Sequence, residues 1–243
     1  MDPNQRIIVA VDTDSITEAK GIVADLAPFV GGFKIGLQFI YAMLVKAASG
    51  EKVAGLDELF ALTQGKLFID GKLNDIPNTV AGAAKAIASL NPFAFNIHAS
   101  SGLQAMQAAA QNKGNAFLWA VTVLTSLGED DCNVIFGASP KEKVLELARL
   151  AKTAGADGII CSPQELEILV GDSELEAMEF ITPGIRPLWS VTGDQQRIMT
   201  PAKAIEVGAT RMVIGRPITN PEGISRVDAV KRILKEIESV GTA

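Results

Sequence analysis

The sequence predicts an α/β protein whose eight strand–helix units close into a single TIM (β/α)8 barrel. Three observations carry this prediction: short apolar runs recur along the chain, amphipathic or alanine-rich segments separate them, and the 243 residues match the size of one such barrel. A doubly wound open sheet is the alternative for the same alternation. It is disfavoured because no Gly-x-Gly-x-x-Gly follows the first strand.

Eight runs are expected to be strands, because each is short, rich in β-branched residues and apolar almost throughout, as in parallel strands covered on both faces. They span residues 6–12, 31–37, 66–73, 93–99, 116–124, 156–162, 178–184 and 211–216. The segments between them have the apolar spacing of helices, and several end in a Gly where helices commonly stop. Strand and helix therefore alternate along the whole chain.

Two connections are longer than the repeat requires. Residues 38–65 can hold two helices, which predicts an inserted helix after the second strand, and residues 185–200 form a long loop after the seventh. Loops of this length in compact domains are usually functional or mobile. No linker-like change in composition divides the chain, so we expect one catalytic domain over residues 1–243.

Composition excludes several classes of function. The net charge of −6 argues against a nucleic-acid-binding surface, and no apolar run is long enough to span a membrane. Cys132 and Cys161 lack Cys-x-x-Cys spacing and His98 is the only histidine, so the usual zinc ligands are missing. The first residues do not follow the pattern of a signal peptide, and we expect a cytoplasmic protein.

Charged residues gather where the third expected strand ends, in KLFIDGKLND. Side chains two positions apart in a strand face the same side, so Asp70 and Lys72 should project together while Gly71 faces away. Asp75 follows the strand, and Pro77 suits the first turn of the next helix. The carboxyl ends of barrel strands are where catalytic residues lie, which makes this cluster a candidate site.

Two further charges lie on the preceding strands. Asp12 ends the first expected strand, and Lys34 interrupts the apolar run of the second. Structural ion pairs that neutralise one another are the alternative interpretation of such charges. Five charges on three consecutive strands favour a working site.

A second cluster indicates an anion site. Gly215 and Arg216 end the eighth expected strand, while Arg186 and Gln195 follow the seventh. TIM barrels commonly bind phosphate between these two loops, where a Gly permits close backbone approach and an Arg can bond a phosphate with two hydrogen bonds. An ordinary surface arginine after a tight turn is the alternative.

The sequence resembles the orotidine 5′-monophosphate decarboxylase family over nearly its whole length. The resemblance rests on VAVD (9–12), FKIG (33–36), DGKLNDIPNT (70–79), VTVLTS (121–126), TPGIRP (182–187), GDQQRIMTP (193–201) and VIGRPIT (213–219). It implies a cofactor-free and metal-free decarboxylation of orotidine 5′-monophosphate to uridine 5′-monophosphate in pyrimidine synthesis, by a homodimer with shared active sites.

The resemblance also implies the role of each residue. Lys72 would protonate C6 of the pyrimidine, Asp70 would lie beside the departing carboxylate, and Lys34 and Asp75 would complete the catalytic set, with Asp75 coming from the other subunit. The implied substrate-binding residues are Asp12, Lys34, Asp70, Ile76, Thr79, Thr125, Ser126, Pro183, Arg186, Gln195, Gly215 and Arg216. Asp12 and Lys34 would hold the ribose, Thr79 of the neighbouring chain would assist, Thr125 and Ser126 would contact the base, and Arg186, Gln195, Gly215 and Arg216 would hold the phosphate.

Two positions depart from the family pattern: Gly71 replaces a larger apolar residue and Asn74 a frequent His. Gly71 should soften the strand without removing chemistry. Two other functions are compatible with the pattern, a magnesium-dependent sugar-phosphate decarboxylase and a non-catalytic nucleotide-phosphate binder. The IPNT continuation and the GDQQR loop favour the nucleotide enzyme.

Overall fold

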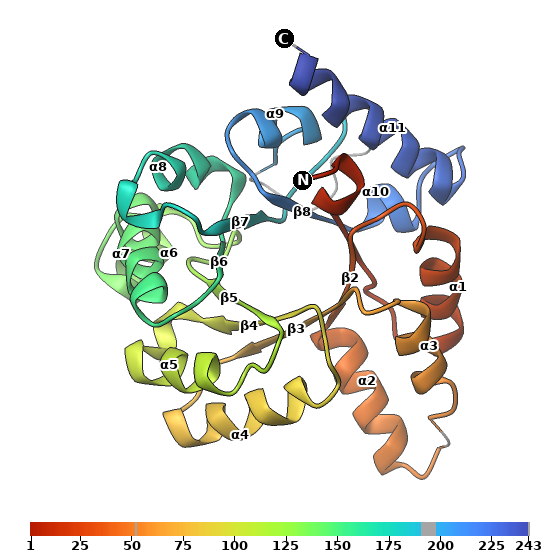
Figure 1. Cartoon of the computed structure of the whole chain (residues 1–243), viewed down its shortest axis with the longest axis horizontal. Helices are drawn as coiled ribbons and strands as arrows, with labels where there is room; N and C mark the ends of the chain where they lie inside the picture. Colours follow the sequence, from red (N-terminus) through yellow and green to blue (C-terminus); the bar gives the residue numbers. More distant parts are fainter. Residues whose placement is uncertain (52, 191–197, 243) are drawn as a thin grey trace.

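Eight parallel strands form a closed barrel in the computed structural model, which describes residues 1–51, 53–190 and 198–242 (Figure 1). The strands follow one another around the barrel in chain order, and β1 pairs with β8 to close it. They are β1 Ile7–Ala10, β2 Gly32–Gly36, β3 Leu67–Leu73, β4 Ala94–His98, β5 Phe117–Val121, β6 Gly158–Ile160, β7 Glu179–Thr182 and β8 Arg211–Ile214. The predicted TIM barrel is confirmed, and every predicted strand contains an observed one.

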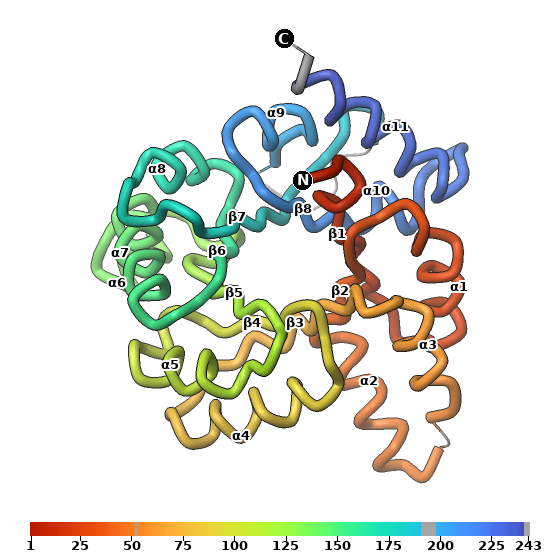
Figure 2. Tube along the Cα trace, viewed as in Figure 1, coloured from red at the N-terminus to blue at the C-terminus, as the bar shows by residue number. Residues whose placement is uncertain are grey.

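Helices surround the barrel (Figure 2). They are α1 Ile16–Leu26, α2 Leu37–Ala48, α3 Leu56–Leu62, α4 Pro77–Ala88, α5 Leu103–Gln111, α6 Glu129–Phe136, α7 Pro140–Thr153, α8 Leu166–Val170, α9 Pro201–Glu206, α10 Arg216–Thr219 and α11 Arg226–Glu238. Both α2 and α3 lie between β2 and β3, which confirms the predicted inserted helix, and α3 packs against α1. The described residues 185–190 and 198–200 of the expected loop after β7 contain no helix or strand, and a bridge pairs Ile185 with Met199. Residues 191–197 of that loop lie outside the described residues.

Short polar side chains fix where several helices begin. The Oγ atoms of Ser15 and Ser225 accept hydrogen bonds from backbone N–H groups at the starts of α1 and α11. At α7, Ser139 and Glu142 form a reciprocal capping box. Such caps satisfy N–H groups that have no partner inside the helix and contribute about 1 kcal/mol each. They set the lengths of the loops that lead to each helix.

The core has two parts, as the nearly continuous apolar strands require. Side chains on the outer face of the barrel pack against the helices in one large cluster that includes Phe33, Phe95 and Ile97. Inside the barrel, Ile8, Phe68, Ala94, Trp119 and Ile181 form a smaller cluster. The Phe68 and Trp119 rings meet edge to face with centroids 4.8 Å apart. The barrel is therefore filled below its carboxyl end.

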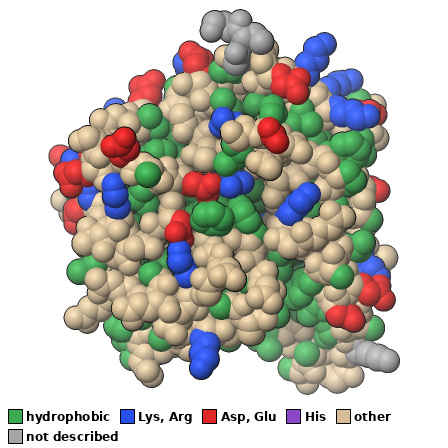
Figure 3. Space-filling view, viewed as in Figure 1, with side chains coloured by type: hydrophobic (Ala, Val, Ile, Leu, Met, Phe, Trp, Pro, Cys, Tyr) green, Lys and Arg blue, Asp and Glu red, His purple; other side chains and the backbone are tan. Residues whose placement is uncertain are grey.

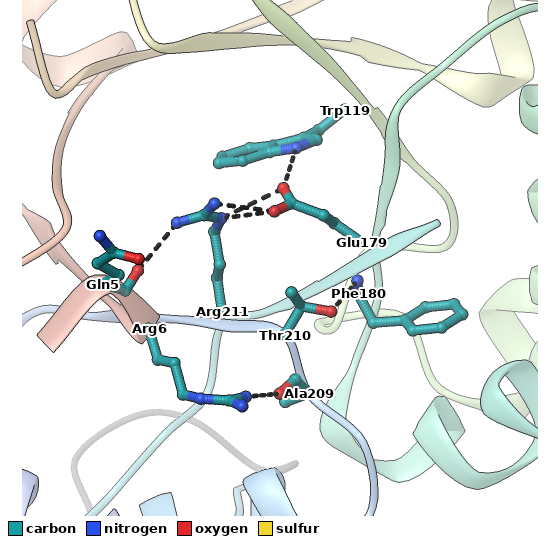
Figure 4. A network of polar contacts seen from close by, with 8 residues as sticks. All are labelled: Gln5, Arg6, Trp119, Glu179, Phe180, Ala209, Thr210 and Arg211. Atoms are coloured by element: carbon teal, nitrogen blue, oxygen red, sulfur yellow. Dashed lines mark hydrogen bonds and ion pairs between the residues drawn. The ribbon is translucent and has the colours of Figure 1, made fainter. Parts of the chain in front are cut away.

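A buried ion pair closes the amino-terminal end of the barrel (Figure 4). Arg211 Nη2 lies 2.8 Å from Glu179 Oε1, and Trp119 Nε1 donates to Glu179 Oε2 over 3.2 Å. Arg211 Nη1 also donates to the carbonyl of Gln5, in the 3₁₀ helix Pro3–Arg6 that precedes β1. Because each charged group has several partners, we interpret these residues as a structural network that fills the amino-terminal end of the barrel.

Figure 3 shows the face turned to the viewer in Figure 1, where Lys, Arg, Asp and Glu side chains are scattered singly or in small groups and form no continuous basic surface. Among the described residues, no helix has both the length and the apolar character needed to cross a membrane.

Candidate active site

The first three strands bring four of the five predicted charges together at the carboxyl end of the barrel. Asp12 lies just beyond β1, Lys34 lies in β2, and Asp70 and Lys72 lie in β3. Ala10 pairs with Lys34 and Gly36 pairs with Asp70, so the strand register places these side chains side by side. The arrangement follows directly from the parallel topology.

The four side chains form a chain of alternating charge. Lys34 Nζ lies 2.8 Å from Asp12 Oδ1 and 3.3 Å from Asp70 Oδ2. Lys72 Nζ lies 2.6 Å from the other oxygen of Asp70, Oδ1. The side chains of Lys34 and Asp70 are 11% and 10% exposed, against 29% for Lys72 and 51% for Asp12. Asp70 is therefore a buried carboxylate held between two ammonium groups, and we refer to these four residues as the charged tetrad.

Opposing effects determine the ionisation of Asp70. Burial penalises its charged form, but the charges of Lys34 and Lys72 and hydrogen bonds from Lys72 and Asn96 outweigh that penalty and hold the pKa of Asp70 below its ordinary value. The carboxylate is thus ionised at neutral pH although it is nearly inaccessible to solvent.

Asn96, in β4, is a member of the site that the sequence analysis did not identify. Its Nδ2 donates to Asp70 Oδ1 over 2.6 Å, and its Oδ1 accepts from the backbone N–H of Lys72 over 2.7 Å. The available signal was the alternation of β4: Phe95 and Ile97 belong to the outer core, so Asn96 and His98 must point inward. Strand alternation alone could therefore have predicted a polar side chain that points into the barrel beside Asp70.

His98 follows Asn96 along the inner face. Burial, followed by the positive charge of Lys72, lowers its pKa below the ordinary histidine value, while Asp70 acts in the opposite direction. The imidazole is therefore neutral at pH 7, which argues against a cationic catalyst at this position.

Three members of the charged tetrad, Lys34, Asp70 and Lys72, border a cavity of about 210 Å³ that opens inside the carboxyl end of the barrel. Its other walls are mostly apolar and include Val121, Val123, Ile160 and Val213. Thr125 and Pro183, both predicted to bind substrate, also line it. Ser126 is exposed and is not part of this lining. One wall of the cavity is thus strongly charged and the rest is apolar.

A second cavity of about 220 Å³ lies where the sequence predicts an anion site. Arg186 and Arg216 both line it, together with Trp189, Ser190 and Asn220. Arg186 is buried and donates from Nη1 to the carbonyl of Ile185, while Arg216 is exposed. Gly215 directly precedes α10 at the end of β8. Gln195, the remaining predicted member, lies outside the described residues.

Comparison with known proteins identifies the family. The family described as "Orotidine 5'-phosphate decarboxylase / HUMPS family" matches residues 5–233. The chain belongs to this family. An orotidine 5′-phosphate decarboxylase from Syntrophomonas wolfei is 38% identical over 98% of this chain and 100% of the relative, and one from Rhodospirillum rubrum is 41% identical over 88% and 87%.

A solved structure supports the same assignment. The orotidine 5′-phosphate decarboxylase of Lactobacillus acidophilus superposes with a TM-score of 0.77 at 31% identity, covering 95% of this chain and 98% of that one. The similarity therefore extends over the barrel as a whole and is not confined to the motifs.

Three residues that the orotidine 5′-phosphate decarboxylase resemblance assigns to a shared site lie at the rim of the barrel. Asp75, Ile76 and Thr79 fall in the exposed segment 74–79, and Ile76 is 66% exposed. Asp75 Oδ1 accepts from the backbone N–H of Ile76 over 2.7 Å. Among the described residues, no contact joins Asp75 to the charged tetrad of its own chain.

The departure from the orotidine 5′-phosphate decarboxylase pattern at Gly71 has a structural counterpart. Gly71 faces away from the tetrad, as the strand alternation predicted, and lines an apolar cavity of about 390 Å³ between β3 and the helices α2, α3 and α4. A Cβ atom at position 71 would meet only Ile69 Cγ2, at 3.8 Å. The missing side chain therefore leaves unfilled space behind the strand that carries Asp70 and Lys72. Asn74, the other departure, is exposed at the rim.

Proposed function

We propose that this protein decarboxylates orotidine 5′-monophosphate to uridine 5′-monophosphate and carbon dioxide, without a cofactor or metal, as a single catalytic domain in pyrimidine synthesis. The observation that carries the proposal is the buried Asp70 carboxylate, which two ammonium groups hold at one wall of an otherwise apolar cavity. Membership of the orotidine 5′-phosphate decarboxylase family supports the choice of substrate.

Asp70 would act on the substrate carboxylate. Two negative charges about 4 Å apart repel by about 4 kcal/mol at an effective dielectric near 20, and this repulsion is relieved when carbon dioxide leaves. It would supply roughly three decades of rate, far below what an inert carbon–carbon bond requires. Most of the acceleration must therefore come from groups that stabilise the developing carbanion.

Lys72 would be that group. Its Nζ lies 2.6 Å from Asp70, and its side chain remains 29% exposed, whereas Lys34 is held by both Asp12 and Asp70. When the bond between C6 and the carboxylate carbon breaks, its electron pair stays on C6 and takes a proton from Lys72 Nζ. Solvent then reprotonates the amine. The apolar walls strengthen the attraction between the ammonium and the carbanion, because they exclude water.

Binding energy from distant parts of the nucleotide would complete the catalysis. Arg186, Gly215, Arg216 and Gln195 would hold the phosphate, and Asp12 and Lys34 the ribose. Thr125, Ser126 and Pro183 would lie against the base. Interactions remote from the reacting carbon can raise the rate when they hold the substrate in the strained, desolvated position.

The rim residues are the basis for proposing a dimer. Asp75, Ile76 and Thr79 are exposed, and they would enter the active site of a second subunit related by twofold symmetry. α2 also presents Tyr41 and Val45, which are 60% and 64% exposed, and apolar surface of this kind is characteristic of interfaces.

The direct test is to incubate the purified protein with orotidine 5′-monophosphate in excess EDTA and follow both substrate absorbance and carbon dioxide release. We expect full activity, because Asp70 Oδ1 accepts from Lys72 and Asn96 while Oδ2 faces Lys34, which leaves little capacity for a cation. Loss of activity in EDTA with rescue by magnesium would favour a sugar-phosphate decarboxylase instead. Tight nucleotide binding without turnover would favour a non-catalytic binder.

A further inference from the structure

Asn96 occupies an unusual place in the barrel. It is 1% exposed and lies on the inner face of β4. The oxygen and the nitrogen of its side-chain amide each form a hydrogen bond with a protein group. One end donates to the Asp70 carboxylate and the other accepts the backbone N–H of Lys72. A single side chain therefore connects two tetrad residues.

The backbone that carries these two residues is irregular. β3 pairs with β4 at Ile69 opposite Phe95 and next at Leu73 opposite Ile97, with a shift in register between the two pairs. Asp70, Gly71 and Lys72 thus lie opposite a single residue of β4, Asn96. Such bulges re-aim side chains and are common beside active sites.

Lys72 adopts a backbone conformation that its side chain does not favour. Its φ is +48°, in the left-handed region that residues with a Cβ rarely adopt. The bulge also displaces the Lys72 N–H from the regular ladder, and Asn96 Oδ1 supplies the acceptor in its place. This hydrogen bond compensates the left-handed turn, and the turn directs Lys72 Nζ back onto Asp70.

We propose that Asn96 is a positioning residue for the decarboxylation: it holds Lys72 in the left-handed conformation and fixes the orientation of the Asp70 carboxylate. The proposal rests on the function proposed above. Asp70 and Lys72 act on opposite sides of the breaking bond, so their relative placement decides whether the proton donor faces C6. A rigid amide that bonds to both residues controls that placement without taking part in the chemistry.

The first test replaces Asn96 with alanine. We expect Asn96→Ala to lower kcat roughly tenfold to a hundredfold, the effect of losing a hydrogen bond to a charged group, with KM and uridine 5′-monophosphate affinity changed less than about threefold. The matched control is Asn112→Ala, which removes a side-chain hydrogen bond to the carbonyl of Ala108 in α5, remote from the tetrad. The control should keep wild-type kcat.

Carbon-13 NMR of the Asp70 carboxyl separates positioning from a general structural effect. The Asn96 hydrogen bond stabilises the charged form, so its removal should raise the pKa of Asp70 in Asn96→Ala and leave it unchanged in Asn112→Ala. The Asp70 resonance is assigned from its disappearance in Asp70→Asn. A lower kcat without a change in this pKa would overturn the proposal.

Asn96→Asp keeps the shape of the side chain and covers the case in which Asn96→Ala fails to fold. Its carboxyl oxygen can still accept from Lys72, but it can donate to Asp70 only while protonated. The ratio of its kcat to that of the wild type should therefore fall as pH rises through the titration of the new carboxyl group. A pH-independent ratio, or wild-type kcat in Asn96→Ala, would refute the positioning role. Absence of carbon dioxide release by the wild-type protein would instead refute the proposed function.

Discussion

The ammonium group of Lys34 lies so close to Gly36 that a Cβ atom at position 36 would come within 2.8 Å of Nζ. The same atom would lie 3.4 Å from Asp12 Oδ1 and 3.7 Å from Asp70 Oδ2. The missing side chain at the end of β2 therefore creates the space in which the tetrad assembles.

Gly36→Ala should reduce activity roughly tenfold or more while leaving stability nearly unchanged. The added methyl group displaces only the flexible end of Lys34, but that movement breaks the spacing between Lys34, Asp12 and Asp70. Gly82→Ala is the control, because nothing lies within 4 Å of a Cβ at position 82, in α4. Steady-state kinetics and urea unfolding of both variants test this, and wild-type kcat in Gly36→Ala would contradict it.

Asp70 should make stability depend on pH in a defined window. Because its folded pKa is lowered, the stabilisation is fully present above the unfolded pKa, which is close to 3.8, and is lost as pH falls through the folded pKa. The free energy of unfolding of the wild type should therefore exceed that of Asp70→Asn at pH 7. Urea titrations should show this difference shrinking below about pH 4. A constant difference down to pH 3 would be inconsistent with the pairing.

Gly71→Ala should stabilise the protein. The new methyl group enters the apolar cavity behind β3 and meets only an ordinary contact, so we expect a gain of about 0.5–1 kcal/mol in unfolding free energy with unchanged kcat. Gly158→Ala should instead destabilise the protein, because its Cβ would come within 2.8 Å of the Glu179 carbonyl oxygen. Urea midpoints that move in the same direction for the two variants would contradict this account.

Arg216 should contribute through the substrate phosphate. Arg216→Ala is expected to lower kcat/KM for orotidine 5′-monophosphate roughly a hundredfold. Orotidine, which lacks the phosphate, should be a poor substrate for the wild type, and its turnover should change very little in Arg216→Ala. Arg149→Ala removes the same charge from the surface of α7, where Arg149 pairs with Asp172. Measuring both substrates with both variants isolates the phosphate contribution. Equal losses of kcat/KM for the nucleotide and the nucleoside in Arg216→Ala would contradict phosphate binding in this cavity.

The proposed dimer predicts that two inactive variants restore each other. Lys72→Ala and Asp75→Asn homodimers should each be nearly inactive. In a hybrid dimer, one site collects both lesions and the other receives wild-type Lys72 and Asp75. Random exchange of equal amounts makes half the dimers hybrid, so activity should recover to about one quarter of wild type.

The measurement is decarboxylase activity after the two variants are dissociated together and reassociated, with exchange followed by native mass spectrometry. Asp12→Ala mixed with Lys72→Ala provides the control, because both residues belong to the tetrad of one chain. Exchange without recovery for Lys72→Ala and Asp75→Asn would place Asp75 in its own subunit's site.

Asp12 and Lys72 lie in the same chain's tetrad, so each site of that hybrid carries one lesion and the control pair should show no recovery. Recovery is expected only for Lys72→Ala mixed with Asp75→Asn. Recovery in the control pair would mean that the tetrad is divided between chains.

The barrel was predictable because its signal is repeated. Each strand is an apolar run bounded by polar residues, and the observed strands lie inside the predicted runs but are shorter, as with β6 Gly158–Ile160 inside 156–162. Apolar residues continue past the point where pairing ends, because they also cover the barrel ends. Helix α6 was not predictable in the same way, because its first turn carries Glu129, Asp130 and Asp131 and its buried side chains are few.

The candidate site was only partly predictable. Strand alternation correctly placed Asp70 and Lys72 on one side, but the contact between them depends on a bulge and on the left-handed backbone of Lys72. Neither can be read from the residue types, because lysine has no preference for that conformation. Asn96 was overlooked because a single amide within the apolar run FAFNIHA carries no motif.

Closure of the barrel by β1 and β8 should determine which parts of the molecule unfold locally and which unfold only globally. Every strand has two paired neighbours, so no strand can leave without disrupting both, and the backbone amides of the barrel should exchange with deuterium only through global unfolding. Amides in the exposed rim segment 74–79 should exchange through small local openings. Asp70 and Lys72, the proposed reacting groups, should thus be anchored in the slowest-opening part of the molecule, while the neighbouring rim opens without disturbing them.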